Sequence, residues 1–298
     1  MDLIFLGTPA FAAPTLEKII EAGHKVLTVI TQPDRPKGRG QMLAPSPIKE
    51  AAFRHNLTVY QPERIRRPEV VEKLAALHAD AMVVVGYGQI IPQSIIDLPR
   101  YGIINVHASL LPKYRGAAPV QWAIVNGERV TGVTTMRIDA GLDTGDMLLR
   151  AETGIRSDET AVELGATLAE LGARLLVETL EQIESISPEK QDNTQATYAP
   201  ILKKEDGRID WTESAQAIHN RVRGLQPWPG AWTTFRGQKL HIWKTRLGVA
   251  PESLCVICPD GIVVEVLEVQ LEGKKRMTGE AFANGQRLQD NNILGELS

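Results

Sequence analysis

Asn105 and His107 place an amide and an imidazole one residue apart at the end of the apolar run GIINVH. Side chains i and i+2 of an extended segment point to the same side, so both groups would face one space. A second polar cluster, DAGLDTGD at residues 139–146, follows the strand-type run TGVTTMRI. Open α/β sheets bind ligands beyond the carboxyl ends of their strands. We therefore predict that Asn105, His107 and Asp143 converge at neighbouring strand ends.

These three side-chain types suit acyl transfer. Amide and imidazole donors stabilise a developing oxyanion, while a carboxylate keeps a histidine protonated or relays a proton. Ser109 lacks the G-x-S-x-G elbow of a serine nucleophile. The chemistry indicated is therefore direct attack of a substrate amine on a carbonyl. The residues alone leave a structural alternative open, with a satisfied polar pair at a strand end and aspartates that cap a tight turn.

Other chemistries lack their motifs. The first strand is followed by GTPAFAA, and the chain has neither a G-x-G-x-x-G dinucleotide pattern nor a G-x-x-x-x-G-K-[ST] phosphate loop. The acids of residues 139–146 do not have the ligand spacing of a calcium loop. Cys255 and Cys258 lie in the apolar run LCVIC, where residues i and i+3 of a strand face opposite sides. We predict buried cysteines there and no bound metal.

Two domains are predicted from the alternation of apolar patterns. Strand-type runs alternate with helical spacing over residues 1–186, and ADAMVVVG is apolar enough to be covered on both faces. This is typical of a Rossmann-like α/β catalytic domain with an open, mostly parallel sheet and flanking helices. Residues 187–206 are polar and without periodicity, which indicates a linker. Residues 207–298 contain short β-type segments broken by Gly and Pro, which favours a smaller, OB-like β-barrel.

Charge and hydropathy suggest where the protein acts. The 298 residues have a net charge of −3, yet residues 203–246 contain nine Lys or Arg against four Asp or Glu. Such a basic segment fits a polyanionic partner, although charge alone favours a solvated surface. No apolar run approaches the length of a membrane span, and the N-terminus MDLIFLGTPAF lacks the basic region of a secretory signal. We expect a cytoplasmic protein.

Taken together, the polar motifs carry a resemblance. They are N-x-H at 105–107, SLLP at 109–112, YRG at 114–116 and DAGLDTGD at 139–146. Their combination resembles the formyltransferase family that uses 10-formyltetrahydrofolate, and the similarity extends over essentially the whole chain. Carried over to this sequence, it implies that Asn105 donates to the formyl oxygen, that His107 assists, and that Asp143 sets the protonation of the histidine and helps to move the amine proton.

The resemblance also implies binding residues. Those for the folate would be Ser109, Leu110, Leu111, Pro112, Gly86, Tyr87, Gly88, Gln89, Ile90, Ile91 and Asp139. The nucleophile would be the α-amino group of methionine on initiator tRNA, contacted by the loop DRPKGRG and by the basic segment. The residues expected to bind tRNA are Arg35, Lys37, Arg39, Lys203, Lys204, Arg208, Arg221 and Arg223.

Several alternatives remain at this level. A related enzyme could formylate a sugar nucleotide or glycinamide ribonucleotide, and the same three residues could direct water in a formyl-folate hydrolase. A nucleic-acid binding module with a degenerate enzyme domain is the rival from another class. We expect a monomer that binds tRNA and neither DNA nor membranes.

Overall fold

The computed structural model describes residues 1–37, 42–248, 254–288 and 294. Arg39, a predicted tRNA contact, lies outside the described residues. The chain divides into two compact units, each made of three segments. The first unit comprises Met1–Gly116, Gly132–Thr153 and Gly165–Tyr198, and the second comprises Ala117–Thr131, Gly154–Leu164 and Ala199–Ser298.

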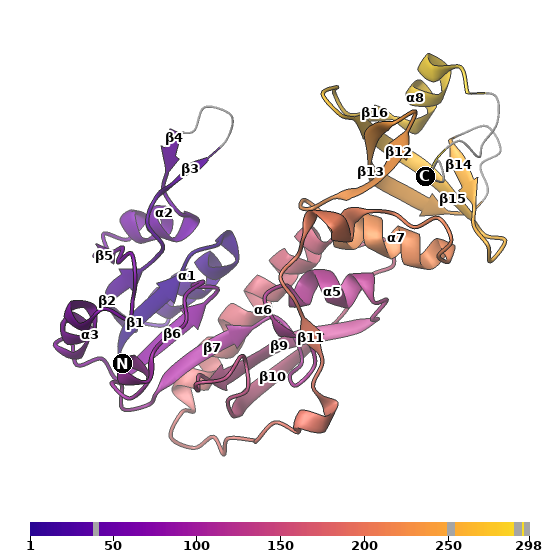
Figure 1. Ribbon diagram of the computed structural model, residues 1–298. Coiled ribbons are helices and arrows are strands. Elements are labelled where there is room, and N and C mark those ends of the chain that lie inside the picture. Colours follow the sequence, from indigo (N-terminus) through magenta and orange to yellow (C-terminus); the bar gives the residue numbers. More distant parts are fainter. Residues whose placement is uncertain (38–41, 249–253, 289–293, 295–298) are drawn as a thin grey trace. The chain divides into compact units, whose positions relative to one another are not determined.

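A seven-stranded sheet forms the first unit (Figure 1), in the order β10-β9-β7-β6-β1-β2-β5. The pairs β1/β2, β1/β6, β2/β5 and β6/β7 are parallel, whereas β7/β9 is antiparallel. This confirms the predicted mostly parallel sheet. The strands are β1 (Asp2–Gly7), β2 (Lys25–Ile30), β5 (Val59–Tyr60), β6 (Ala81–Val85), β7 (Ile103–His107), β9 (Val130–Arg137) and β10 (Met147–Gly154).

Helices connect and flank these strands, as the alternating pattern predicts. They are η1 (Ala10–Ala12), α1 (Ala13–Glu21), α2 (Pro47–Arg54), α3 (Pro68–Ala75), α4 (Gln93–Ile96), α6 (Ala161–Glu181) and η2 (Asn193–Gln195). Two small antiparallel or bridging pairs complete the unit: β3 (Arg35–Lys37) with β4 (Met42–Ala44), and β8 (Arg115–Gly116) with β11 (Tyr198–Ala199).

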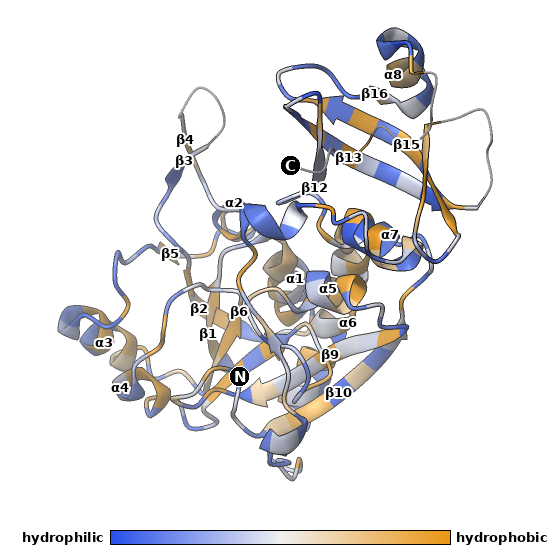
Figure 2. Ribbon diagram, turned by 45° about the vertical axis from the view of Figure 1, so that its right-hand side comes forward, coloured by the Kyte–Doolittle hydropathy of each residue, from blue (hydrophilic) through white to orange (hydrophobic). Residues whose placement is uncertain are grey.

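The core of this unit explains the fully apolar strands. All five residues of β6 are buried, and β6 is coloured apolar in Figure 2. Ile4, Leu6, Met82 and Val84 pack in one cluster with residues of α3. Each fully buried aliphatic side chain stabilises the fold by about 1.5–3 kcal/mol, so the sheet is a rigid base for the loops at its strand ends.

The second unit contains an antiparallel sheet, in the order β12-β13-β15-β14 with β16 paired to β15. This confirms the predicted C-terminal β domain. Burial alternates along β12, and β13 and β15 show alternating hydropathy in Figure 2, as expected for strands with one face in a core. The elements are α5 (Pro119–Val125), η3 (Lys204–Gly207), α7 (Ala215–Gly224), β12 (Ala231–Phe235), β13 (Gln238–Leu247), β14 (Cys255–Ile257), β15 (Val263–Leu271), β16 (Met277–Thr278) and α8 (Gly279–Gln286).

Some local predictions differ from the structure. Thr8 precedes Pro9, a pair that predicts a helix N-cap followed by proline at the first helical position. Instead its hydroxyl donates to the carbonyl oxygen of Tyr87 at 3.1 Å, and the α-helix begins only at Ala13. The strand β10 is not predicted, because its second half alternates half-buried and exposed residues at the edge of the sheet. Cys255 and Cys258 are free and buried, as predicted.

Candidate active site

The strand β7 positions Asn105 and His107. It lies between β6 and β9, with Asn105 opposite Val84 on one side and Met136 on the other. Pairing on both edges fixes its register, so the two side chains project from the same face of the strand. Asn105 is 9% exposed and His107 is 6% exposed. The sheet thus holds an amide and an imidazole together in a largely water-excluded place.

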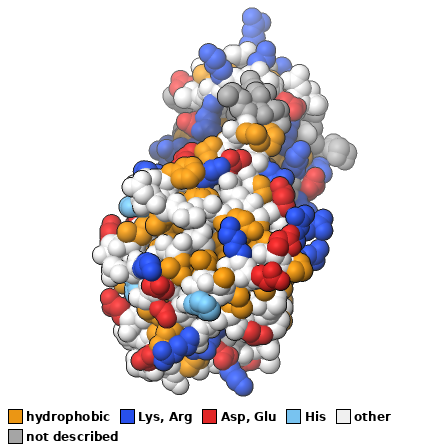
Figure 3. Space-filling model, turned by 90° about the vertical axis from the view of Figure 1, so that its left-hand side faces the viewer, with side chains coloured by type: hydrophobic (Ala, Val, Ile, Leu, Met, Phe, Trp, Pro, Cys, Tyr) orange, Lys and Arg blue, Asp and Glu red, His pale blue; other side chains and the backbone are white. Residues whose placement is uncertain are grey.

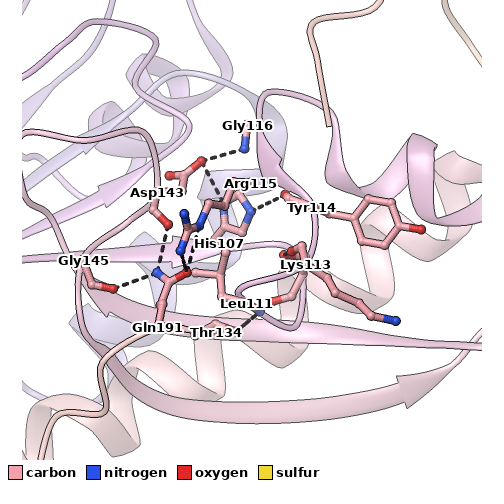
Figure 4. A network of polar contacts seen from close by, with 11 residues as sticks. His107, Leu111, Lys113, Tyr114, Arg115, Gly116, Thr134, Asp143, Gly145 and Gln191 are labelled. Atoms are coloured by element: carbon pink, nitrogen blue, oxygen red, sulfur yellow. Dashed lines mark hydrogen bonds and ion pairs between the residues drawn. The ribbon is translucent and has the colours of Figure 1, made fainter. Parts of the chain in front are cut away.

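The two nitrogens of His107 have different partners (Figure 4). Nε2 lies 2.9 Å from the carbonyl oxygen of Tyr114. Because a carbonyl only accepts hydrogen bonds, Nε2 carries a hydrogen and donates it. Nδ1 lies 3.7 Å from Oδ2 of Asp143, which is longer than a hydrogen bond. Nδ1 is therefore the ring nitrogen that has no hydrogen-bond partner among the described residues and that faces the space beside the carboxylate.

Main-chain groups of the neighbouring loop and of its own turn fix the position of Asp143. Its Oδ2 accepts a hydrogen bond of 2.8 Å from the backbone N–H of Gly116. Asp143 itself has φ of +52°, a left-handed conformation that aspartate tolerates better than most side chains. Two residues on, a Cβ at Gly145 would lie 1.9 Å from the carbonyl oxygen of Arg137. The turn therefore requires glycine at 145 and orients Asp143 towards His107.

The Asn105 carboxamide is available for a ligand. Within the described part of the chain, no group forms a hydrogen bond with this carboxamide, although the residue is nearly buried. Buried amides are normally paired, because an unpaired one costs about 1–3 kcal/mol. An amide that no described group bonds, on the same strand face as His107, is the arrangement expected of a group that stabilises a developing oxyanion.

The SLLP segment shapes the loop rather than lining it with all of its side chains. Ser109 is fully buried, and its hydroxyl donates to the carbonyl oxygen of Lys113 at 2.6 Å. Leu111 is also buried and packs against Met136 and Met147. The side chains of Ser109 and Leu111 therefore face the protein interior. This differs from the prediction that they bind folate, and leaves Leu110 and Pro112, both half-buried, as the candidates in this segment.

The 86–92 loop divides in the same way. Tyr87 and Ile91 are buried in the core cluster of the sheet, and burial raises the pKa of Tyr87 to about 12. Gln89 is used within the protein: its Oε1 accepts from the N–H of Ile65 at 2.8 Å. Ile90 is 91% exposed. The exposed positions Gly86, Gly88 and Ile90 are thus the ones placed to meet a ligand.

Asp139 caps its own turn. Its carboxylate accepts from the N–H of Gly141 at 2.9 Å and from the hydroxyl of Thr144 at 2.8 Å. The structural alternative raised by the sequence therefore accounts for Asp139, while Asp143 in the same run has a different environment. The prediction of a folate contact by the Asp139 carboxylate is not needed to explain its position.

The basic residues predicted to bind tRNA differ in exposure. Exposed side chains are those of Arg35, Lys203, Lys204 and Arg208. Lys37 lies in β3, and its side chain is outside the described part of the structure. Acidic and basic side chains are interspersed on the face drawn in Figure 3, so charge on that face does not form a field of one sign.

Arg223 does not fit its predicted role. It is 7% exposed, and its guanidinium donates to Oδ1 of Asn220 and to the carbonyl oxygens of Arg156 and Glu159. These protein partners account for the position of Arg223, and tRNA binding by Arg223 is not needed to explain it. Arg221 is partly committed as well, because it forms an ion pair of 2.8 Å with Glu213.

Several residues that organise the site were not predicted from the sequence. Gln191 lies in the segment predicted as a linker, yet it is 9% exposed and hydrogen-bonded to both loops of the site. Thr134 accepts from the N–H of Leu111 and donates to the carbonyl oxygen of Ser109. Neither has a motif of its own. The YRG motif at 114–116 was the only sequence feature that pointed to Tyr114 and Gly116, whose main-chain groups bond His107 and Asp143.

Family models match both parts of the chain. Residues 1–180 match the model described as "Formyl transferase", and residues 201–287 match "Formyl transferase, C-terminal domain". The chain therefore belongs to the formyl transferase family, and it is an enzyme of this type. Among the described residues there is no group of three or more metal-ligating side chains, and no described helix is both long and apolar enough to cross a bilayer.

Relatives narrow the comparison within this family. The chain is 65% identical over 309 residues to the methionyl-tRNA formyltransferase of Solibacter usitatus, with 99% of each chain covered. It is 56% identical over 311 residues to that of Koribacter versatilis, with 100% of each covered. A solved sugar 3N-formyl transferase, WlaRD with dTDP and 5-N-formyl-THF, has a TM-score of 0.69 at 20% identity, covering 92% of this chain and 99% of that one. The last likeness shows a shared fold.

Proposed function

We propose that the protein transfers the formyl group of 10-formyltetrahydrofolate to the α-amino group of methionyl initiator tRNA. The observation that carries this proposal is the Asn105 carboxamide, which no described group bonds, on the same strand face as His107, whose Nδ1 lies near Asp143. A full-length relative named methionyl-tRNA formyltransferase, at 65% identity, supports it. The product, formylmethionyl-tRNA, would serve the initiation of translation.

The side chains divide the reaction between them. The amine nitrogen attacks the formyl carbon, a C–N bond forms, and the carbonyl oxygen becomes an oxyanion. The Asn105 amide and a proton on Nδ1 of His107 stabilise that oxyanion. Collapse breaks the bond between the formyl carbon and N10 of the folate. Asp143 accepts the proton that the amine loses, directly or through water, and the proton passes to the leaving N10, which gives tetrahydrofolate.

The folate would lie along the exposed parts of two loops. Leu110 and Pro112 from one loop, and Gly86, Gly88 and Ile90 from the other, offer apolar surface and backbone edges. A flat heterocycle suits such a lining, because apolar contacts supply area and backbone groups supply hydrogen bonds. The relative WlaRD was solved with a formylated folate, which supports a folate donor here.

The RNA would be bound by the exposed cations. Lys203, Lys204 and Arg208 form no ion pair with the described part of the chain. Arg35, at the base of the β3/β4 hairpin, lies 3.9 Å from Glu63, at the limit of an ion pair. Such side chains can neutralise phosphates at little cost. We propose a catalytic part at residues 1–186, a connecting segment at 187–206 and an RNA-binding part at 207–298, acting as a cytoplasmic monomer.

A direct assay tests the proposal. Purified protein is incubated with 10-formyltetrahydrofolate and charged initiator tRNA, and formylmethionine is measured after deacylation. Charged elongator methionyl-tRNA, a sugar nucleotide amine and glycinamide ribonucleotide are supplied in parallel. Formylation of initiator tRNA at the highest kcat/KM supports the proposal. Preference for a small amine, or release of formate without an acceptor, would contradict it.

A further inference from the structure

Gln191 uses its whole hydrogen-bonding capacity within the first unit. Its Oε1 accepts two hydrogen bonds from the Arg115 guanidinium, at 3.0 and 2.8 Å. Its Nε2 donates to the carbonyl oxygens of Asp143 and Gly145, at 2.9 and 2.8 Å. A guanidinium only donates and a carbonyl only accepts, so the orientation of the amide is determined by its partners.

The segment around Gln191 is itself fastened to the sheet and to the loop. Glu189 exchanges two backbone hydrogen bonds with Met147, the first residue of β10, at 2.8 and 2.9 Å. Beyond Gln191, Oδ1 of Asn193 accepts from Arg115 at 2.9 Å, and the carbonyl oxygen of Thr197 accepts from the N–H of Arg115 at 2.9 Å. Gln191 is therefore held from both sides and can in turn hold other groups.

The two loops that Gln191 joins are the two that orient the catalytic pair. Arg115 is followed by Gly116, whose N–H donates to Asp143, and preceded by Tyr114, whose carbonyl oxygen accepts from His107. Gln191 connects this loop to the carbonyl oxygens of the Asp143 turn (Figure 4). The 3.7 Å separation of Nδ1 and Oδ2 thus depends on how the two loops are held together.

We infer that Gln191 is a positioning residue for Asp143: its amide fixes the Asp143 turn against Arg115, so that the carboxylate stays beside Nδ1 of His107. The inference deepens the proposed function and rests on it. Its alternative is a role in folding alone, in which Gln191 merely satisfies a buried arginine. The two roles differ because positioning requires the Nε2 donors, whereas satisfying Arg115 requires only Oε1.

The variant Gln191→Glu separates these roles. A carboxylate still accepts from Arg115, but it has no hydrogen to donate and would bring an oxygen against the carbonyl oxygens of Asp143 and Gly145. A misplacement near 1 Å can cost about 100-fold in rate. We expect kcat to fall about 10- to 100-fold, with the KM of folate and of tRNA changed less than about 3-fold. The control is Gln238→Glu, the same change at an exposed position outside the site, which should retain wild-type turnover.

A double-mutant cycle with Asp143→Asn tests whether Gln191 acts through the carboxylate. Groups that act as one unit give strongly non-additive losses. We expect Gln191→Glu to reduce kcat by less than about 3-fold in the Asp143→Asn background. If the two losses multiply, or if Gln191→Glu alone leaves kcat within 3-fold of wild type, the inference is overturned.

A crystal structure of Gln191→Glu provides a readout independent of turnover. The inference expects the Asp143 carboxylate to move away from Nδ1 of His107, while the Arg115 contact persists. An unchanged Nδ1–Oδ2 separation would contradict it. If wild-type protein makes no formylmethionyl-tRNA, the proposed function fails by that assay, and this separation alone then decides whether Gln191 positions Asp143.

Discussion

Two histidines, one in each unit, are buried close to an aspartate, and their surroundings differ. His107 has Nδ1 3.7 Å from Asp143, whose side chain is 18% exposed. His219, in α7, has Nε2 3.4 Å from Asp158, whose side chain is 83% exposed. Nδ1 of His219 is also bonded to the hydroxyl of Thr245 at 2.9 Å. Both ring nitrogens of His219 thus have partners within the protein, and the aspartate near it, Asp158, is exposed to solvent.

The contrast teaches that a buried His–Asp pair is not by itself a catalytic site. At His107 the aspartate is shielded and fixed by a backbone N–H. The Asn105 amide shares the strand face of His107, and no described group bonds to it. At His219 the aspartate is screened by solvent, and the neighbouring Asn220 accepts three hydrogen bonds, two of them from Arg223. Availability for a ligand distinguishes the two places.

The largest difference should come from changing each aspartate to asparagine. Asp143→Asn keeps the size of the side chain but removes its negative charge and its capacity to take a proton, so kcat should fall about 100- to 10,000-fold. Asp158→Asn changes an exposed acid, and kcat should stay within about 2-fold of wild type. Single-turnover formylation of tRNA measures both. Equal effects would show that the comparison is wrong.

The two asparagines extend the same test. Asn105→Ala removes an oxyanion donor and should lower kcat about 100-fold or more, with little change in thermal stability because no described group loses a partner. Asn220→Ala leaves Arg223 short of an acceptor, and should lower the free energy of unfolding by about 1–3 kcal/mol. Thermal unfolding and turnover, measured on both variants, should show opposite patterns. A stability loss confined to Asn105→Ala would reverse the assignment.

Two basic residues of the second unit should have different roles, one in stability and one in tRNA binding. Arg223→Met should destabilise the protein by about 1–3 kcal/mol for each buried acceptor left without a donor. Lys204→Ala should leave stability within about 0.5 kcal/mol but weaken tRNA binding and reduce its salt slope by about 1. Titrations of tRNA at several salt concentrations measure the slope, with folate binding as the salt-insensitive control. A salt slope unchanged by Lys204→Ala would place the RNA elsewhere.

The smallest effect is a pH dependence of stability at His219. Burial, with a contribution from Arg223, lowers the pKa of His219. The unfolded chain takes up this proton near the ordinary value of about 6.5, whereas the folded chain does so only at lower pH. Stability therefore falls as pH drops below about 6.5, by up to about 1.4 kcal/mol per pH unit, until the folded pKa is reached.

The variant His219→Gln should show a weaker acid dependence than wild type. Urea unfolding between pH 5 and pH 8 measures it, with wild type and variant at the same ionic strength. Turnover at pH 8 should be little affected, in contrast to changes at Asp143. Identical pH dependence in both proteins would show that His219 does not titrate between the two states.

Sequence patterns predicted the strands of the sheet more completely than the contacts of the site. An apolar run such as ADAMVVVG predicts a strand that is covered on both faces, and β6 confirms this prediction. His107 and Asp143 do converge, as predicted, but not because two carboxyl strand ends meet. β9 is antiparallel to β7, and its last residue, Arg137, pairs with Ile104 near the start of β7. The protein partners of Arg223 and Gln89 were not predicted, because a charge count contains no information on burial and a loop position does not reveal the direction of a side chain.

Gln191 could not have been found by the same reasoning. Its segment has no helical or strand periodicity, and its partners are a guanidinium and two carbonyl oxygens from distant parts of the chain. Hydrogen bonds of this kind depend on tertiary geometry, and a polar residue in a polar run gives no signal of burial. Such residues are identified only when the hydrogen-bond partners in the folded site are known.

The main-chain partners of the catalytic pair affect how the site can change during evolution. The carbonyl group of Tyr114 and the N–H of Gly116, which hold His107 and Asp143, belong to the backbone. A substitution at Tyr114 alters what surrounds the site without deleting the acceptor itself. Divergence can therefore reshape the loops for a new acceptor amine while the orientation of the two catalytic side chains is inherited, provided that the backbone path is kept.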